Sequence, residues 1–106
     1  MIYTAEDLDT ILKKVRNNEN ITITDSEHFI DNTERKYCDY NFIYELIKTH
    51  NPVNIKLSKN NKFTVVYENY LNNDYYIVIV IFIKNLNELR LVTTFPVNVK
   101  RGGKYL

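Results

Sequence analysis

The sequence contains a single cysteine, Cys38, so it can form no internal disulfide and offers no cysteine-rich metal site. Its two histidines, His28 and His50, are too few for a histidine-rich metal site. Both glycines, Gly102 and Gly103, lie near the end of the chain, and no glycine-rich phosphate loop or nucleophile elbow occurs. These shortages exclude most enzyme classes, and we expect no metal, no other cofactor and no disulfide-linked partner.

No hydrophobic run is long enough for a membrane helix. The longest, residues 75–83, has about half of the roughly 20 residues that a spanning helix needs, and it is rich in β-branched side chains. The first seven residues have neither a basic start nor an apolar segment, unlike a secretory signal. We therefore expect a cytoplasmic protein that does not associate with a membrane.

Length and charge favour one domain without a strongly charged surface. The 106 residues are too few for two cores of ordinary depth, so residues 1–106 are expected to form a single domain. The 14 Lys and Arg residues are nearly balanced by 13 Asp and Glu residues, which gives a net charge of +1. Any attraction to nucleic acid must therefore come from a local basic patch.

The first half, residues 1–51, has the spacing of helices. Residues 4–18 begin with a capping-box variant at Thr4 and Asp7 and continue with an apolar stripe on one helical face. Two shorter stripes follow before Pro52, which ends the last of them because the residue before proline avoids the α region. We expect two to three helices here.

The second half, residues 53–96, has the spacing of strands. Four apolar segments are separated by short turns rich in asparagine, at 53–57, 62–70, 75–84 and 88–95. Connections this short join antiparallel neighbours. The third segment is apolar on both faces, which predicts a central strand that is covered on both sides, with the helices on one of them.

These patterns predict an α+β fold in which two to three N-terminal helices pack on a four-stranded antiparallel sheet. Residues 21–24 alternate between apolar and hydroxyl side chains, typical of a brief edge strand or of an extended lead, so a fifth strand is the alternative. The basic tail, residues 97–106, is expected to be mobile or to be ordered only by a ligand.

Two groups of polar residues can act on a phosphodiester. His28 and Arg35 are seven positions apart, so an unbroken helix would place them on one side, about 10 Å apart along the axis. An imidazole can move a proton near neutral pH, and a guanidinium binds phosphate oxygens. Thr93 and Thr94 can donate hydroxyl hydrogens from the end of the last strand.

Simpler roles compete with these. A histidine at the start of a helix is more often a surface or capping residue, and Arg35 can pair with a nearby carboxylate at little gain in stability. Threonine is also a good strand residue. Most of the tyrosines are expected at the edges of the core, although Tyr67 or Tyr70 can stack on a base of single-stranded RNA.

An early His and Arg, His28 and Arg35, precede a predicted helix that ends at Asn51-Pro52. Four apolar strand segments follow: Val53-Asn54-Ile55, Phe63-Thr64-Val65-Val66-Tyr67, Ile77-Val78-Ile79-Val80 and Leu91-Val92-Thr93-Thr94-Phe95-Pro96. In this order of features, residues 28–96 resemble the small nucleases grouped with barnase, EndoU, colicin and RelE-like toxins.

The resemblance implies metal-independent cleavage of RNA by attack of the ribose 2′-hydroxyl on the adjacent phosphate. It assigns proton transfer to His28 and phosphate stabilisation to Arg35, Lys100 and Arg101, with Thr93 or Thr94 as a hydroxyl donor. The chain would then be an endoribonuclease toxin held inactive by an antitoxin or inhibitor protein. Two alternatives stay open: a noncatalytic protein-interaction module, such as a phage or antitoxin-like partner, and an RNA-binding domain that does not cleave.

Overall fold

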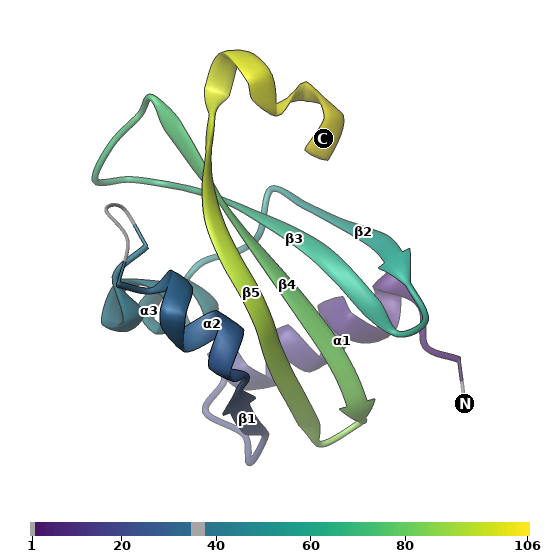
Figure 1. Cartoon of the computed structure of the whole chain (residues 1–106). Coiled ribbons are helices and arrows are strands. Elements are labelled where there is room, and N and C mark those ends of the chain that lie inside the picture. The colour runs from purple at the N-terminus through teal and green to yellow at the C-terminus, as the bar shows by residue number, and fades with distance from the viewer. Residues whose placement is uncertain (1, 35–37) are drawn as a thin grey trace.

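The computed structural model describes residues 2–34 and 38–106 and confirms an α+β fold (Figure 1). None of the helices in this part of the chain has the length and apolar character needed to cross a membrane. The elements are α1 (Ala5–Arg16), β1 (Thr22–Asp25), α2 (Glu27–Asn32), α3 (Tyr40–Thr49), β2 (Asn54–Lys59), β3 (Lys62–Glu68), β4 (Tyr75–Asn85), β5 (Glu88–Asn98) and the 3-10 helix η1 (Val99–Tyr105).

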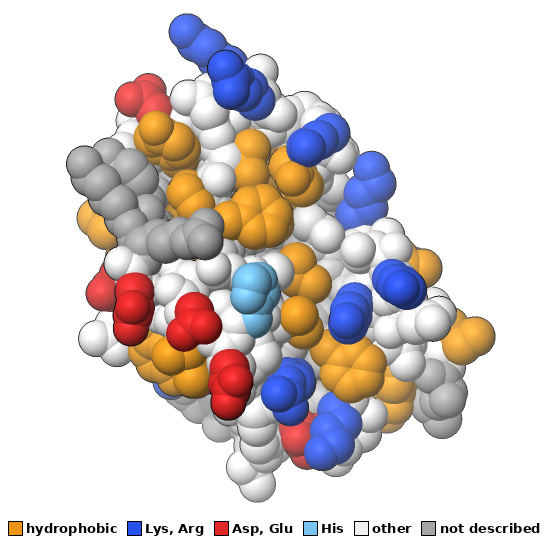
Figure 2. All heavy atoms as spheres, in the orientation of Figure 1, with side chains coloured by type: hydrophobic (Ala, Val, Ile, Leu, Met, Phe, Trp, Pro, Cys, Tyr) orange, Lys and Arg blue, Asp and Glu red, His pale blue; other side chains and the backbone are white. Residues whose placement is uncertain are grey.

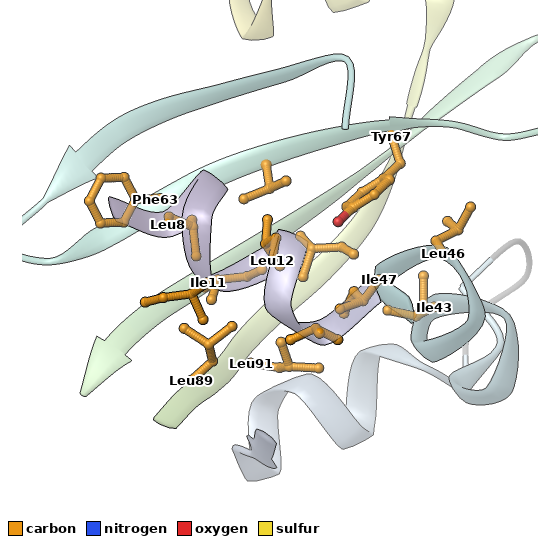
Figure 3. Packing of buried hydrophobic residues seen from close by; sticks show 14 of the residues in the cluster. Leu8, Ile11, Leu12, Ile43, Leu46, Ile47, Phe63, Tyr67, Leu89 and Leu91 are labelled. Atoms are coloured by element: carbon orange, nitrogen blue, oxygen red, sulfur yellow. The ribbon is translucent and has the colours of Figure 1, made fainter. Parts of the chain in front are cut away.

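The first helix forms where the sequence predicts it. The backbone N–H of Asp7 donates to the Thr4 hydroxyl at 3.1 Å, and the Thr4 N–H donates to the Asp7 carboxylate at 2.7 Å, which completes a capping box. The apolar stripe of α1, which includes Leu8, Ile11 and Leu12, is buried beneath the sheet (Figure 3). Capping and amphipathic spacing together explain why this segment is helical.

The sheet has the strand order β1-β5-β4-β3-β2. The four strands of the second half are antiparallel, as predicted, but the fifth strand, β1, runs parallel to β5, so the sheet is mixed. A parallel neighbour requires a long crossover, and α2, α3, β2, β3 and β4 lie between β1 and β5 in the chain.

Helices α1 and α3 cover one face of the sheet. Alternate residues of β4, from Ile77 to Ile83, join α1 and α3 in the main core cluster. On the opposite face Val78 is fully buried, but Val80 and Phe82 are only half-buried. The prediction that β4 is covered on both sides is therefore right at Val78 and wrong at Val80 and Phe82, which are left partly exposed on the second face.

The partial cover on that second face is the C-terminal segment. In place of a mobile tail, residues 99–105 form η1, which leaves the end of β5 (Figure 1). The Tyr105 ring packs edge-on against Phe95 at 5.9 Å between centroids, and the Asn54 side-chain amide donates to the Tyr105 carbonyl at 3.0 Å. The segment thus crosses from β5 to β2, and the sheet beyond it is left open.

Candidate functional site

The uncovered half of the second face presents two rows of side chains, as the strand pairing shows. Side chains that are direct partners across the strands point to the same face, so each row can be followed across the sheet. We call these eight residues the open face: Thr24, Arg90, Phe82 and Lys62 in one row, and Thr93, Val80, Thr64 and Lys56 in the next.

The open face combines an apolar centre with a basic border. Val80 and Phe82 are half-buried, whereas Arg90, Lys62 and Lys56 are exposed. Figure 2 shows this side of the molecule, with basic side chains over β2 and β3, acidic side chains over α2, and a histidine between the acidic group and a hydrophobic strip. Basic groups around a half-exposed aromatic ring are the features with which proteins bind single-stranded nucleic acid.

Helix α2 is fixed to the edge of β5 by its N-cap residue. The Ser26 hydroxyl donates to the Val92 carbonyl at 2.6 Å and accepts from the Phe29 N–H at 3.0 Å. The Ser26 N–H also donates to the Leu91 carbonyl at 2.9 Å. Because β5 has a bulge between its pairings at Leu91 and Thr93, the capping serine meets the strand where its register shifts.

Asp25 anchors α3 to the same junction. The hydroxyls of Tyr40 and Tyr44 both donate to its carboxylate, the first at 2.5 Å. The hydrogen bond to Asp25 raises the pKa of Tyr40, and burial together with that hydrogen bond raises the pKa of Tyr44. Both phenols therefore remain protonated donors near neutral pH, and they hold β1 and the start of α2 in place.

A side-chain hydrogen bond joins α2, the helix that carries His28, to Thr93. The Asn32 side-chain amide donates to the Thr93 hydroxyl, so this side of α2 faces the open face. His28 lies one turn before Asn32 on the same side of the helix, and its side chain is exposed. Helix α2, which carries His28, is thus bonded to the strand that carries Thr93.

Arg90 is a functional candidate that the sequence reasoning missed. It lies in the row beside Thr93, is exposed, and is the direct cross-strand partner of Phe82. A signal was present, since Arg90 stands between the core residues Leu89 and Leu91, and alternation places it on the other face. Arg90 therefore adds a cation to the open face in the row next to Thr93.

Two predicted site residues are buried instead. Thr94 lies on the helix side of the sheet, is fully buried, and donates its hydroxyl to the Val78 carbonyl at 2.9 Å. Tyr67 is also fully buried, with its ring inside the helix–sheet interface (Figure 3). Neither side chain can reach a ligand on the open face, and we do not retain either as a contact residue.

Arg35 lies outside the described residues, so its side chain has no assigned place. The helix that was expected to carry both His28 and Arg35 ends early, because α2 stops at Asn32 with Thr33 as its C-cap. The spacing of about 10 Å along one unbroken helix therefore does not apply to this pair.

The remaining candidates lie toward the other end of the sheet. Lys100 and Arg101 are exposed on η1, which starts directly after Asn98, the last paired residue of β5. Tyr70 follows β3, is 47% exposed, donates its hydroxyl to Glu45 at 2.8 Å, and lines a surface pocket of about 340 Å³. These groups are separate from the His28 and Thr93 pair.

No group of three or more metal-ligating side chains occurs within residues 2–34 and 38–106. Comparison of the chain with protein-family models, with curated proteins and with solved structures finds no match. The inference of function therefore rests on the open face and on the side chains of α2 beside it.

Proposed function

We propose that the protein is a small endoribonuclease that binds single-stranded RNA on the open face and cleaves it without a metal ion. The observation that carries the proposal is the position of Thr93 and Arg90 in adjacent rows of the open face, together with the hydrogen bond from Asn32, one helical turn after His28, to Thr93. A proton carrier, a hydroxyl donor and a phosphate-binding cation are the groups that this reaction needs. The resemblance to small nuclease toxins adds support.

The proposed reaction begins when the neutral His28 imidazole takes the proton of a ribose 2′-hydroxyl. The 2′-oxygen attacks the adjacent phosphorus and forms a new P–O bond, while Arg90 and the Thr93 hydroxyl stabilise the charge on the phosphate oxygens. The bond to the 5′-oxygen of the next nucleotide then breaks, and that oxygen takes a proton from His28 or water. The products are a 2′,3′-cyclic phosphate and a free 5′-hydroxyl.

The Asn32 hydrogen bond suits Thr93 to this role. Because the Thr93 oxygen accepts from the Asn32 amide, its own hydrogen remains available to donate to a phosphate oxygen. Phe82 offers a ring on which a base can stack, and Lys62 and Lys56 lie along the continuing path across the sheet. A partner protein that covers this face would keep such a toxin inactive in the cytoplasm.

The charge on α2 favours a second candidate, RNA binding without cleavage. Glu27 and Asp31 flank His28 in sequence and are exposed, so a phosphate close to the imidazole would meet negative charge. RNA would then follow the basic side of the open face over β2 and β3 and remain intact.

The deciding experiment incubates purified protein with a labelled single-stranded RNA, with and without EDTA. We expect cleavage that survives EDTA, leaves 2′,3′-cyclic phosphate ends, and falls about 100-fold or more in His28→Ala. Lys13→Ala is the control, because Lys13 lies on α1 and pairs with Asp9 at 3.1 Å, and it should cleave normally. RNA that binds but stays intact would establish the second candidate, and RNA that neither binds nor is cut would overturn both.

A further inference from the structure

The surface pocket lined by Tyr70 lies toward the other end of the sheet from α2. It sits between the turn that joins β3 to β4 and the beginning of η1, and has a volume of about 340 Å³. A neighbouring recess of about 390 Å³ shares three of its lining residues, Asn73, Tyr75 and Val99, so the two are adjacent, and we call them together the cleft. Its size is at the lower end of the range for small-molecule sites.

Backbone hydrogen bonds hold the walls of the cleft together. The Val99 N–H donates to the Asp74 carbonyl at 2.9 Å, which ties η1 to the turn. Within the turn, the buried Asn69 side chain accepts from the N–H groups of Leu71 and Asn72 at 3.0 and 3.1 Å. The cleft is therefore preformed, which lowers the entropic cost of binding.

Gly102 seats the C-terminal segment against one wall. A Cβ atom at this position would lie 2.8 Å from Cδ2 of Tyr76, whose ring lines the cleft. Gly103, the next residue, has no heavy atom within 4 Å of the equivalent position. Close packing of η1 on Tyr76 thus depends on Gly102 and not on Gly103.

The lining has the chemistry of a base-binding site. Tyr70 and Tyr76 supply aromatic rings, Asn73 supplies an amide, and Glu68 supplies a carboxylate that can accept hydrogen bonds. Lys100 lines the adjoining recess and is exposed, where it can meet a phosphate. Rings for stacking, polar groups for the base edge and a nearby cation are the three parts of a nucleotide site.

We propose that this cleft binds one base of the RNA, and that Glu68 makes it prefer a base with an exocyclic amino group, such as cytosine, over uracil. A carboxylate accepts a hydrogen bond from the N4 amino group of cytosine but meets only an oxygen at that position of uracil. The inference rests on the proposed function for its RNA ligand, and it assigns to the same protein a specificity site separate from the site of cleavage.

The spacing allows one RNA strand to use both sites. Tyr76 and Val80 are four residues apart in β4, so the cleft begins about 14 Å from the row that contains Thr93. The segment η1 lies on this side of the sheet and exposes Lys100 and Arg101 for the phosphates of a connecting strand. The preferred base would therefore lie some nucleotides away from the cut.

The test titrates ¹⁵N-labelled protein with CMP, UMP and inorganic phosphate. CMP should shift the amide signals of Asn73, Tyr76 and Val99, and UMP should bind about tenfold more weakly. Phosphate alone should leave these signals unchanged. Equal binding of CMP and UMP, the same shifts with phosphate, or shifts confined to the open face would each overturn the proposal.

Three variants sharpen the result. Gly102→Ala should weaken CMP binding about tenfold, because either η1 or the Tyr76 ring must move, whereas Gly103→Ala should bind normally. Glu68→Gln should remove the preference for CMP over UMP, because an amide both donates and accepts. Normal CMP binding by Gly102→Ala, or an unchanged preference in Glu68→Gln, would contradict the assigned geometry.

Failure of this inference is distinguishable from failure of the proposed function. If RNA is cleaved in a His28-dependent manner but CMP does not bind the cleft, the base site is overturned and the nuclease stands. If CMP binds the cleft with the stated preference but RNA is left uncut, the base site is supported and the cleavage proposal fails.

Discussion

The side-chain amide of Asn32 donates a hydrogen bond to the hydroxyl of Thr93 and thereby joins α2 to β5. Asn32 is only 6% exposed, so this bond satisfies a polar group that burial would otherwise penalise. It also brings His28 to the border of the open face, because His28 and Asn32 lie one turn apart on one side of α2. One contact thus contributes to stability and assembles the proposed site.

Thr93 and Thr94 should respond differently to loss of the hydroxyl. Thr93→Val leaves the Asn32 amide without its partner and removes a donor to phosphate, so we expect a loss of about 1 kcal/mol in unfolding free energy and about 100-fold slower RNA cleavage. Thr93→Ser should retain both. Urea unfolding and single-turnover cleavage provide the measurements.

Thr94→Val is the control on the opposite side of the sheet. It removes a buried hydrogen bond to the Val78 carbonyl, so stability should fall by about 1 kcal/mol. Cleavage by the folded protein should stay unchanged. A Thr94→Val protein that folds but has lost cleavage would mean that the open face is wrongly assigned.

The basic border of the open face should contribute to the salt dependence of RNA binding. For single strands, each lost phosphate contact lowers the slope of log affinity against log salt by about 0.7. We expect this decrease in Lys56→Gln, Lys62→Gln and Arg90→Gln, measured by fluorescence anisotropy. Lys13→Gln should keep the wild-type slope, because Lys13 lies on α1 and pairs with Asp9 at 3.1 Å. Equal slopes in all four variants would place the RNA elsewhere.

Two tyrosines, the fully buried Tyr67 and the half-buried Tyr44, predict opposite effects of substitution by phenylalanine. The Tyr67 hydroxyl is buried and has no hydrogen-bond partner among the described residues, so Tyr67→Phe should stabilise the protein by about 1 kcal/mol. Tyr44→Phe should destabilise it by a similar amount, because its hydroxyl donates to Asp25. Urea denaturation of both variants tests the pair, and a destabilised Tyr67→Phe would show that this hydroxyl has an unseen partner.

Alkaline pH should weaken the fold through Tyr44. Burial, followed by the hydrogen bond to Asp25, raises its pKa above the value of about 10 expected in the unfolded chain. The stabilisation is fully present below about pH 10 and is lost as the pH rises further, because the unfolded chain then releases a proton that the folded chain keeps. Urea midpoints measured from about pH 8 to about pH 11 should fall less steeply in Tyr44→Phe than in the wild type.

Local patterns predicted most of the elements but not their assembly. The capping positions at Thr4 and Asp7 located α1, and the asparagine-rich turns located the strands of the second half, because capping and turn formation depend on neighbours in the sequence. The parallel pairing of β1 with β5 was not predictable in this way. Partners separated by most of the chain leave no local signal of their orientation.

The candidate site shows the same division. Sequence reasoning selected His28 and Thr93 by chemical type, but it gave Thr94 equal weight and omitted Arg90. The bulge in β5 decides which of the two threonines faces the open face. It also places Arg90 and Thr93, three residues apart, on the same side of the sheet. A bulge depends on the pairing of two strands and cannot be counted from one.

By itself, the sequence determined that helices precede an antiparallel set of strands, that β4 is central, and that no large cysteine or histidine cluster is available. These properties follow from periodicity and composition, which act over a few residues. Only the tertiary structure decided that η1 covers half of the second face, that Tyr67 and Thr94 are buried, and that Asn32 of α2 bonds to Thr93. Those outcomes depend on long-range packing, because a segment is buried only where a segment distant in the sequence packs against it.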